Sequence, residues 1–334
     1  MALTFVHPGL RHTQPRRVVL KLVTFEVHGE ERIGALENDT IVDLNLAHEL
    51  RMSEWAESGK GMPKAFPQRM IDFLESEEET KQYTSDLIAH LRGLLKERQR
   101  ELEKQRVLRN IHDVHLLPPI PAPPKIICLG LNYTDHAEEA HVPIPKEPIL
   151  FSKPSTAIIG PDDSIVYPRI SSQVDYEIEL AVVMGKRGRN ISESDAFDYI
   201  AGYTVFNDIS ARDLQFADKQ WFRGKSFDTF APTGPCLVLT DQVPDPHCLR
   251  MELRVNGERR QNGTTGNMIF RIPQLITFIS RVMTLQPGDV IATGTPAGVG
   301  FYAKPEKRLL RPGDLIEAEI EGVGVLKNRV VSEQ

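Results

Sequence analysis

The chain of 334 residues is 40% hydrophobic and 26% charged, an ordinary composition for a globular protein with a sizeable core. Its net charge of −6 at pH 7 argues against nucleic acid as a partner, and no stretch reaches the roughly 18 apolar residues of a membrane-spanning helix. The cysteines are far apart and form no C-x-x-C pair, which suits a reducing compartment and argues against a disulfide framework or a zinc site; they are Cys128, Cys236 and Cys248.

The first 25 residues contain no acidic residue and carry four basic ones: Arg11, Arg16, Arg17 and Lys21. Basic residues without acids are a weak feature of a mitochondrial transit segment. Serine is absent, however, and no clear amphipathic period appears, so an irregular N-terminal extension fits as well. We expect a cytoplasmic or mitochondrial location.

Short strands and then helices are expected in the first third of the chain. Residues 18–25 and 40–44 are rich in Val, Leu, Ile and Thr and read as strands, with a glycine-containing turn between them at His28 and Gly29. Between residues 70 and 110 leucines recur at helical spacing in a highly charged sequence. This pattern predicts one or two amphipathic helices that form an arm packed on a larger domain.

A proline-rich stretch follows at residues 118–124 and predicts a stiff, extended linker. We place the domain boundary there. Residues 1–117 would form a small N-terminal α/β module with its helical arm, and residues 125–334 the larger domain. Beyond about residue 158 the sequence alternates strand and turn signals, interrupted by one helix between Pro273 and Met283.

A strand at residues 125–130 leads into a segment that can form a short helix. In this helix His136 and Glu139 would lie three residues apart on one face, where their side chains can meet. Glu138 is the adjacent alternative partner, which i,i+3 geometry disfavours. A carboxylate beside an imidazole orients the ring and raises its basicity, so the pair is a candidate general base.

An acidic strand at residues 174–183 is the centre of the predicted site. Period 2 puts Asp175, Glu177 and Glu179 on one face, about 7 Å apart, where they repel one another unless a cation screens them. A solvated polar face of an edge strand would carry the same pattern. A cation site would place a positive charge against this face of the strand, whereas a solvated face would be exposed to water.

Asp208 ends an apolar run at residues 203–210, and a buried acid there needs a positive partner. Arg212, four residues on, would supply a purely structural ion pair. Together with Glu177 and Glu179, however, Asp208 forms a set of three carboxylates without a His or Cys ligand motif nearby. Oxygen ligands of this kind suit Mg²⁺, with Mn²⁺ or Ca²⁺ as alternatives.

Six segments together resemble the fumarylacetoacetate hydrolase family over roughly residues 124–330: NYTDHAEE, VDYEIELAVVMGK, GYTVFNDISARDLQ, GKSFDTFAPTGP, RVNGERRQ and GDVIATGTPAGVG. The small N-terminal module and the segment KQWFRGKSFDTF resemble the domain-containing type 2 members. The resemblance implies an α+β, β-rich fold whose catalytic domain is a mixed β-roll or sandwich. It also implies a homodimer.

The resemblance assigns roles to eight residues. The metal ligands would be Glu177, Glu179 and Asp208, the catalytic residues His136, Glu139 and Lys225, and the substrate contacts Gln215 and Thr295. Lys225 would supply positive charge to an oxyanion or enolate. Two departures stand out. The founding hydrolase has an extra metal carboxylate with no counterpart in residues 128–131, and some short members that act on small 2-oxo acids carry Arg at the position of Leu131.

These residues imply a Mg²⁺-dependent enzyme that acts on a 1,3-dicarbonyl or 2-oxo acid through a metal-stabilised enolate. The implied reactions are C–C bond hydrolysis, as with acylpyruvates or fumarylacetoacetate, and oxaloacetate tautomerisation. Oxaloacetate decarboxylation is an alternative from the same enolate. A non-catalytic alternative is a metal-stabilised binding or scaffold protein.

Overall fold

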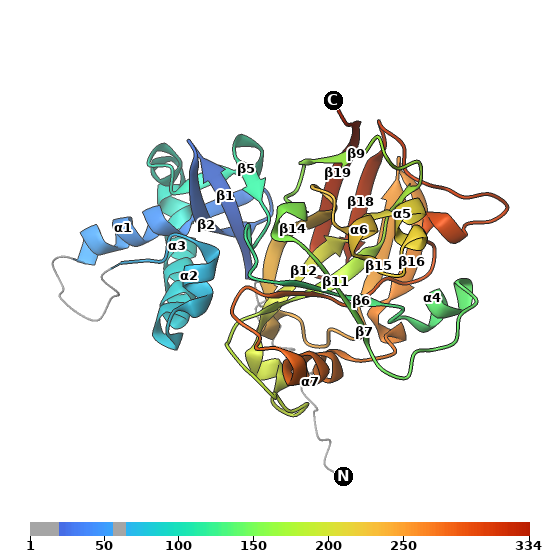
Figure 1. The fold of residues 1–334 in the computed structure, drawn as a ribbon. Helices are drawn as coiled ribbons and strands as arrows, with labels where there is room; N and C mark the ends of the chain where they lie inside the picture. The colour runs from blue at the N-terminus through green and yellow to red at the C-terminus, as the bar shows by residue number, and fades with distance from the viewer. Residues whose placement is uncertain (1–19, 56–64) are drawn as a thin grey trace, which may run out of the picture.

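The computed structural model describes residues 20–55 and 65–334. Its N-terminal part is an antiparallel sheet flanked by helices (Figure 1). The strands are β1 (Lys21–Val27), β2 (Glu30–Glu37), β3 (Thr40–Asp43), β4 (Leu108–Asn110) and β5 (His115–Leu117). The helices are α1 (Leu44–Trp55), α2 (Met70–Glu75) and α3 (Glu78–Lys104). No helix in these ranges is long and apolar enough to cross a membrane.

The turn at His28 and Gly29 and the two helices between residues 70 and 110 are confirmed. Both turn residues have positive φ, at 54° and 81°, as in the two-residue turns that join antiparallel strands. The sequence did not predict β2, because its first three residues, Glu30, Glu31 and Arg32, are charged. Residues 1–19 of the transit-like feature, which was predicted for the first 25 residues, lie outside the described residues.

The N-terminal strands extend the main sheet of the molecule. β1 pairs antiparallel with β14 (Ala231–Leu239), with Leu22 opposite Leu237, and this pairing joins the sheet order β4-β3-β2-β1-β14-β12-β11-β17-β6-β7. One hydrophobic cluster contains Leu87 of α3 together with Phe206. The division at residues 118–124 stays a prediction, because one sheet and one cluster run across it.

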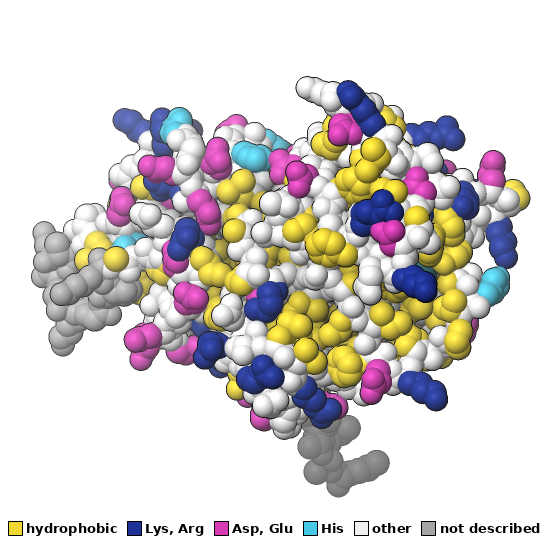
Figure 2. Space-filling model, in the orientation of Figure 1, with side chains coloured by type: hydrophobic (Ala, Val, Ile, Leu, Met, Phe, Trp, Pro, Cys, Tyr) yellow, Lys and Arg dark blue, Asp and Glu magenta, His cyan; other side chains and the backbone are white. Residues whose placement is uncertain are grey.

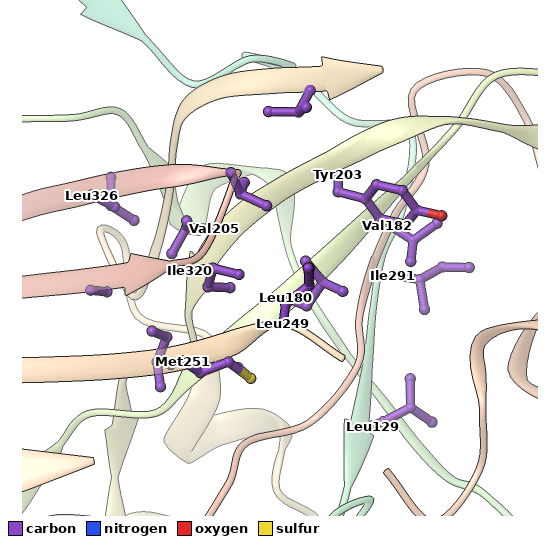
Figure 3. Close-up of a cluster of buried hydrophobic side chains, with 14 of the residues drawn as sticks. Leu129, Leu180, Val182, Tyr203, Val205, Leu249, Met251, Ile291, Ile320 and Leu326 are labelled. Atoms are coloured by element: carbon purple, nitrogen blue, oxygen red, sulfur yellow. The ribbon is translucent and has the colours of Figure 1, made fainter. Parts of the chain in front are cut away.

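A second sheet, in the order β16-β15-β18-β19-β9, packs on the first (Figure 1). Its strands are β9 (Ser164–Tyr167), β15 (Arg250–Val255), β16 (Glu258–Thr264), β18 (Leu315–Ile320) and β19 (Gly324–Ser332). Figure 3 shows the core between the sheets, where Leu180 and Val205 of the main sheet approach Met251, Ile320 and Leu326 of the second. Parallel pairs such as β17–β6 occur among antiparallel ones, so the α+β, β-rich mixed fold is confirmed.

The remaining strands belong to the main sheet, except β10 and β13, which pair with each other as a separate sheet of two strands. The strands are β6 (Ile126–Gly130), β7 (Ile149–Lys153), β8 (Ile158–Ile159), β10 (Val174–Asp175), β11 (Ile178–Met184), β12 (Ile200–Asn207), β13 (Ser210–Ala211) and β17 (Val290–Ala292). The helices are α4 (Thr134–Glu139), α5 (Arg212–Ala217), α6 (Phe222–Lys225) and α7 (Ile272–Val282). The predicted helices at His136 and after Pro273 are thus confirmed. Figure 2 shows hydrophobic side chains gathered where Figure 1 draws β6 and the edge strand β7.

The acidic segment is not one continuous strand, contrary to the expectation for residues 174–183. β10 pairs with β13, whereas β11 belongs to the main sheet beside β12 and β17. Between β10 and β11, side-chain amides accept hydrogen bonds from the backbone in place of a neighbouring strand. The backbone N–H of Glu177 donates to Asn207 Oδ1, and that of Ile178 donates to Gln261 Oε1. Asp175, Glu177 and Glu179 are all buried, so the interpretation of this segment as a solvated polar face is wrong.

Candidate active site

A cavity of about 170 Å³ opens between α4, the start of β11 and helices α5 and α6. Six of the eight predicted site residues line it: His136, Glu177, Glu179, Gln215, Lys225 and Thr295. The other two, Glu139 and Asp208, lie directly behind lining residues. The structure therefore brings all eight together, although they come from segments as far apart in sequence as residues 136 and 295.

Three buried carboxylates form one side of the site. Glu177, Glu179 and Asp208 each offer an oxygen within 4.8 Å of the others, and all three are buried. The backbone N–H of Asp208 donates to the carbonyl of Glu177 at 2.8 Å, which fixes the segment after β12 against the segment before β11. Glu179 accepts a 2.7 Å hydrogen bond from the backbone N–H of Gly294.

This set of oxygens fits a hard divalent cation. Burial, followed by the charges of Asp208 and Glu177, raises the pKa of Glu179 well above its usual value. Ionisation of Glu179 beside two other carboxylates would need added positive charge, which an oxygen-preferring ion such as Mg²⁺ or Mn²⁺ would provide. The described part of the chain places no His or Cys ligand in the same cluster.

Lysine and arginine side chains contact the same carboxylates. Lys225 Nζ lies 2.7 Å from Glu177 Oε2 and 2.6 Å from Asp208 Oδ2, and Arg212 lies 2.6 Å from Glu177 Oε1. Burial opposes the ionisation of Glu177, but Lys225 and Arg212 outweigh it and hold its pKa below the usual value. The anticipated structural pair between Arg212 and Asp208 is wrong. The partners of Asp208 are Lys225 and Lys153, the latter 2.7 Å from Oδ1.

Asp175 is not part of the three-carboxylate cluster, but Arg212 contacts both it and Glu177. It accepts hydrogen bonds from Arg212 Nε at 2.9 Å and from the backbone N–H groups of Gly300 at 2.8 Å and Phe301 at 3.0 Å. Its carboxylate is therefore satisfied by the loop that carries Tyr302 into the cavity wall. Asp175 is a bracing residue beside the cluster.

His136 and Glu139 lie on α4, and His136 lines the same cavity as Glu177 and Glu179. His136 Nδ1 lies 3.3 Å from Glu139 Oε2, and the other oxygen of Glu139 accepts from the Gly298 N–H at 3.0 Å. Glu138 is exposed, so the structure pairs the histidine with Glu139, as the spacing predicted. Because Nδ1 is engaged, Nε2 is the ring nitrogen left for a substrate.

The two predicted substrate contacts already make internal hydrogen bonds. Gln215 Oε1 accepts from Arg212 at 3.0 Å. The Thr295 hydroxyl donates to the carbonyl of Ile178 and accepts from Gln261 Nε2, both at 2.8 Å. Their side chains line the cavity, but a role in binding substrate stays a prediction.

Sequence reasoning missed three residues that shape the site. Gln261, the last residue of the RVNGERRQ segment, braces both Ile178 and Thr295. Trp221 forms an apolar wall against Gly130, where an added Cβ would meet the indole at 2.1 Å. Lys153 lies behind Asp208. None carries a local signal, because a lone Gln, Trp or Lys is common in any sequence.

Comparison with known proteins places this fold and site in a family. The family model described as fumarylacetoacetate (FAA) hydrolase C-terminal matches residues 125–331. The chain belongs to the fumarylacetoacetate hydrolase family and is an enzyme of that family. Within it the chain is FAHD2-like.

Two relatives illustrate this similarity. Oxaloacetate tautomerase FAHD2B, mitochondrial, of Bos taurus is 47% identical over 267 residues, which are 79% of this chain and 80% of the relative. Oxaloacetate tautomerase Fahd2a, mitochondrial, of Rattus norvegicus is 42% identical over 333 residues, covering 98% of this chain and 96% of the relative. The similarity thus extends over the N-terminal module as well as the catalytic part.

Two solved structures share the fold. A fumarylacetoacetate hydrolase from Exiguobacterium antarcticum is 34% identical with a TM-score of 0.72, covering 94% of this chain and 100% of that one. Maleylpyruvate hydrolase from Sphingobium sp., solved with manganese(II) and pyruvate, is 31% identical with a TM-score of 0.67 and covers the same shares.

Proposed function

We propose that the chain is an oxaloacetate tautomerase that requires Mg²⁺ or Mn²⁺. One observation carries the proposal: His136, held by Glu139, lines the same small cavity as Glu177 and Glu179, and Asp208 lies directly behind these two carboxylates. A 2-oxo acid there would lie between a base and a cation site. The names of the Bos taurus and Rattus norvegicus relatives support this choice of substrate.

Glu177, Glu179 and Asp208 would hold the ion. The bound ion would supply Lewis-acid stabilisation of the negative charge that develops on the substrate oxygens. The manganese(II) and pyruvate in the maleylpyruvate hydrolase structure support a divalent ion and a 2-oxo acid in this fold. Mg²⁺ is the ion we expect, with Mn²⁺ or Ca²⁺ as the other oxygen-preferring candidates.

The side chains of the chain would then move one proton. His136, through Nε2, would remove a proton from the carbon next to the ketone, and the imidazolium would return that proton to the ketone oxygen, which completes the enol and restores neutral His136. Glu139 holds the ring through Nδ1 and stabilises the imidazolium while it carries the proton. Lys225 contributes positive charge beside the developing enolate. In the reverse direction the same steps return the ketone.

C–C bond hydrolysis is the second candidate function. It would use the same residues, with His136 activating a water against a carbonyl rather than removing a C–H proton. The hydrolases among the solved structures support it. Decarboxylation of oxaloacetate would pass through the same enolate. A non-catalytic binding protein is disfavoured, because the base pair and Lys225 are intact.

A substrate panel tests the proposal. Purified protein with Mg²⁺ is mixed with enol-oxaloacetate, acetylpyruvate and fumarylacetoacetate, and each is followed by its enol absorbance together with product analysis. Faster enol–keto conversion of oxaloacetate without release of CO₂ or an acid fragment supports the tautomerase. Cleavage of acetylpyruvate as the faster reaction would replace the proposal by the hydrolase, and release of CO₂ would replace it by the decarboxylase.

A homodimer and a mitochondrial location belong to the same proposal. The relatives from Bos taurus and Rattus norvegicus carry the word mitochondrial in their names, which supports that compartment over the cytoplasm. Light scattering of the purified chain and fractionation of cells that express it test the two statements.

A further inference from the structure

Lys153 is a buried lysine at the end of β7 that reaches the metal-ligand cluster from behind. Its side chain is fully buried, and it does not line the catalytic cavity. Its ammonium lies 2.7 Å from Asp208 Oδ1. Its three N–H groups donate to backbone carbonyls, those of Ile209 at 3.0 Å, Lys225 at 2.6 Å and Phe230 at 2.8 Å, so its contact with Asp208 is an ion pair without a hydrogen bond.

These carbonyls belong to three different segments. Ile209 directly follows Asp208, Lys225 is the last residue of α6, and Phe230 directly precedes β14. A buried ammonium is costly unless it is fully paired, and here each of its partners fixes a part of the site. Lys153 therefore connects the edge strand β7 to one carboxylate and to the backbone of the site lysine.

Lys153 and Lys225 hold opposite oxygens of the same carboxylate. Lys225 contacts Oδ2 and also donates to Glu177, whereas Lys153 contacts Oδ1. Lys225 lines the cavity, so an ion that enters the cavity would approach Lys225 directly. Lys153 lies outside the cavity lining, so it can keep its ion pair with Asp208 Oδ1 when an ion is bound.

We propose that Lys153 is a positioning residue that fixes the orientation of Asp208, so that Oδ2 faces the ion while Oδ1 stays on the ammonium. Lys153 also fixes the backbone of Lys225. The inference depends on the proposed metal site. Outer groups that hold a ligand typically change metal affinity by about 10- to 100-fold when removed.

Lys153→Met tests the proposal, because Met has a similar length without the charge. We expect the Kd for Mn²⁺, measured by calorimetry, to rise about 10- to 100-fold. A role confined to charge repulsion would lower the Kd instead. A role confined to folding would lower the unfolding temperature and leave the Kd unchanged, and either result would overturn the proposal.

Lys125→Met is the matched control. Lys125 directly precedes β6 and makes a 2.7 Å ion pair with the buried Asp289, which directly precedes β17. Neither residue lines the catalytic cavity. Like Lys153→Met, this variant takes the lysine partner away from a buried carboxylate. We therefore expect a lower unfolding temperature with an unchanged Kd for Mn²⁺. If wild-type protein binds no Mn²⁺, the proposed function fails. If wild type binds and Lys153→Met binds equally well, only this inference fails.

A structure of the wild-type protein with Mn²⁺ covers the case in which the variant does not fold. We expect Lys153 Nζ to remain at hydrogen-bonding distance from Asp208 Oδ1, while Oδ2 is directed at the ion. Coordination of the ion through Oδ1, with Lys153 separated from Asp208, would overturn the proposal.

Discussion

Glu139 lies 3.3 Å from His136 Nδ1 through one oxygen and accepts the Gly298 N–H at 3.0 Å through the other. The carboxylate is thus held by the loop 298–302 at the same time as it holds the imidazole. The same loop is fixed at Gly300 by Asp175, next to the carboxylate cluster. The base and the cation site are therefore braced by one loop.

Glu139→Gln should lower kcat by about 10- to 100-fold, because an amide orients the ring but does not stabilise the imidazolium. His136→Ala should cost more, about 10²- to 10⁴-fold. The Kd for Mn²⁺ should stay the same in both variants. Glu138→Gln, at the exposed neighbouring position, is the matched control and should keep full activity. Equal losses in Glu138→Gln and Glu139→Gln would contradict the assigned pair.

Glu179→Gln should abolish tight binding of Mg²⁺ and Mn²⁺, because an amide cannot replace the charge of the buried carboxylate. The fold should survive, since the Gly294 N–H can still donate to the amide oxygen. Calorimetric titration measures the binding, and circular dichroism checks the fold. Glu193→Gln, at an exposed acid far from the cluster in sequence, should bind the ion normally. Unchanged affinity in Glu179→Gln would remove that residue from the ligand set.

His247 should make the protein less stable as the pH falls from about 7 towards 5. Its Nε2 accepts the backbone N–H of Ile272 at the start of α7, and burial followed by the charge of Arg271 lowers its pKa. The lowered pKa favours proton uptake by the unfolded chain, so stability is present above the unfolded value of about 6.5 and lost below it.

His247→Gln should flatten this pH dependence and reduce the proton uptake on unfolding by up to one proton. The unfolding temperature measured between pH 5 and 8 tests this. His112→Gln, at an exposed histidine, should leave the slope unchanged. An unaltered slope in His247→Gln would show that another group controls it.

Gly130→Ala should weaken catalysis by displacing the Trp221 indole, which an added Cβ would meet at 2.1 Å. The indole also packs edge-to-face on Phe151, with 5.5 Å between the ring centroids. It therefore has little room to shift within the cavity wall. We expect kcat/KM to fall about tenfold, the equivalent of roughly 1.4 kcal/mol in the transition state. Gly93→Ala, in α3 with open space around its Cβ, should be neutral or stabilising.

Cys248 should be the one cysteine of the native protein that reacts quickly with a thiol reagent, because Cys128 and Cys236 are buried. Burial raises the pKa of Cys236 to about 11, which further reduces its thiolate fraction. A colorimetric thiol assay should find about one reactive group in buffer and three in denaturant. Cys248→Ser should remove the fast group. Three fast thiols without denaturant would contradict the described core.

The sequence predicted the local parts of the site well. His136 and Glu139 meet because three residues separate them on a helix, and the carboxylates of Glu179 and Asp208 approach because β11 and β12 are neighbouring strands. The break between β10 and β11 was not predictable. It depends on hydrogen bonds to the side chains of Asn207 and Gln261, which lie far from it in the sequence. The pairing of Arg212 with Asp175 rather than Asp208 likewise depends on the contact between β10 and β13, which directly precedes α5.

Titration of Mg²⁺ into chelator-treated enzyme, with the enol absorbance of oxaloacetate as readout, tests the central claim most directly. We predict that activity is absent in chelator and returns in a saturable manner as one ion binds per chain. His136→Ala should bind that ion without recovering activity. Full activity of the wild-type protein in chelator would contradict the account.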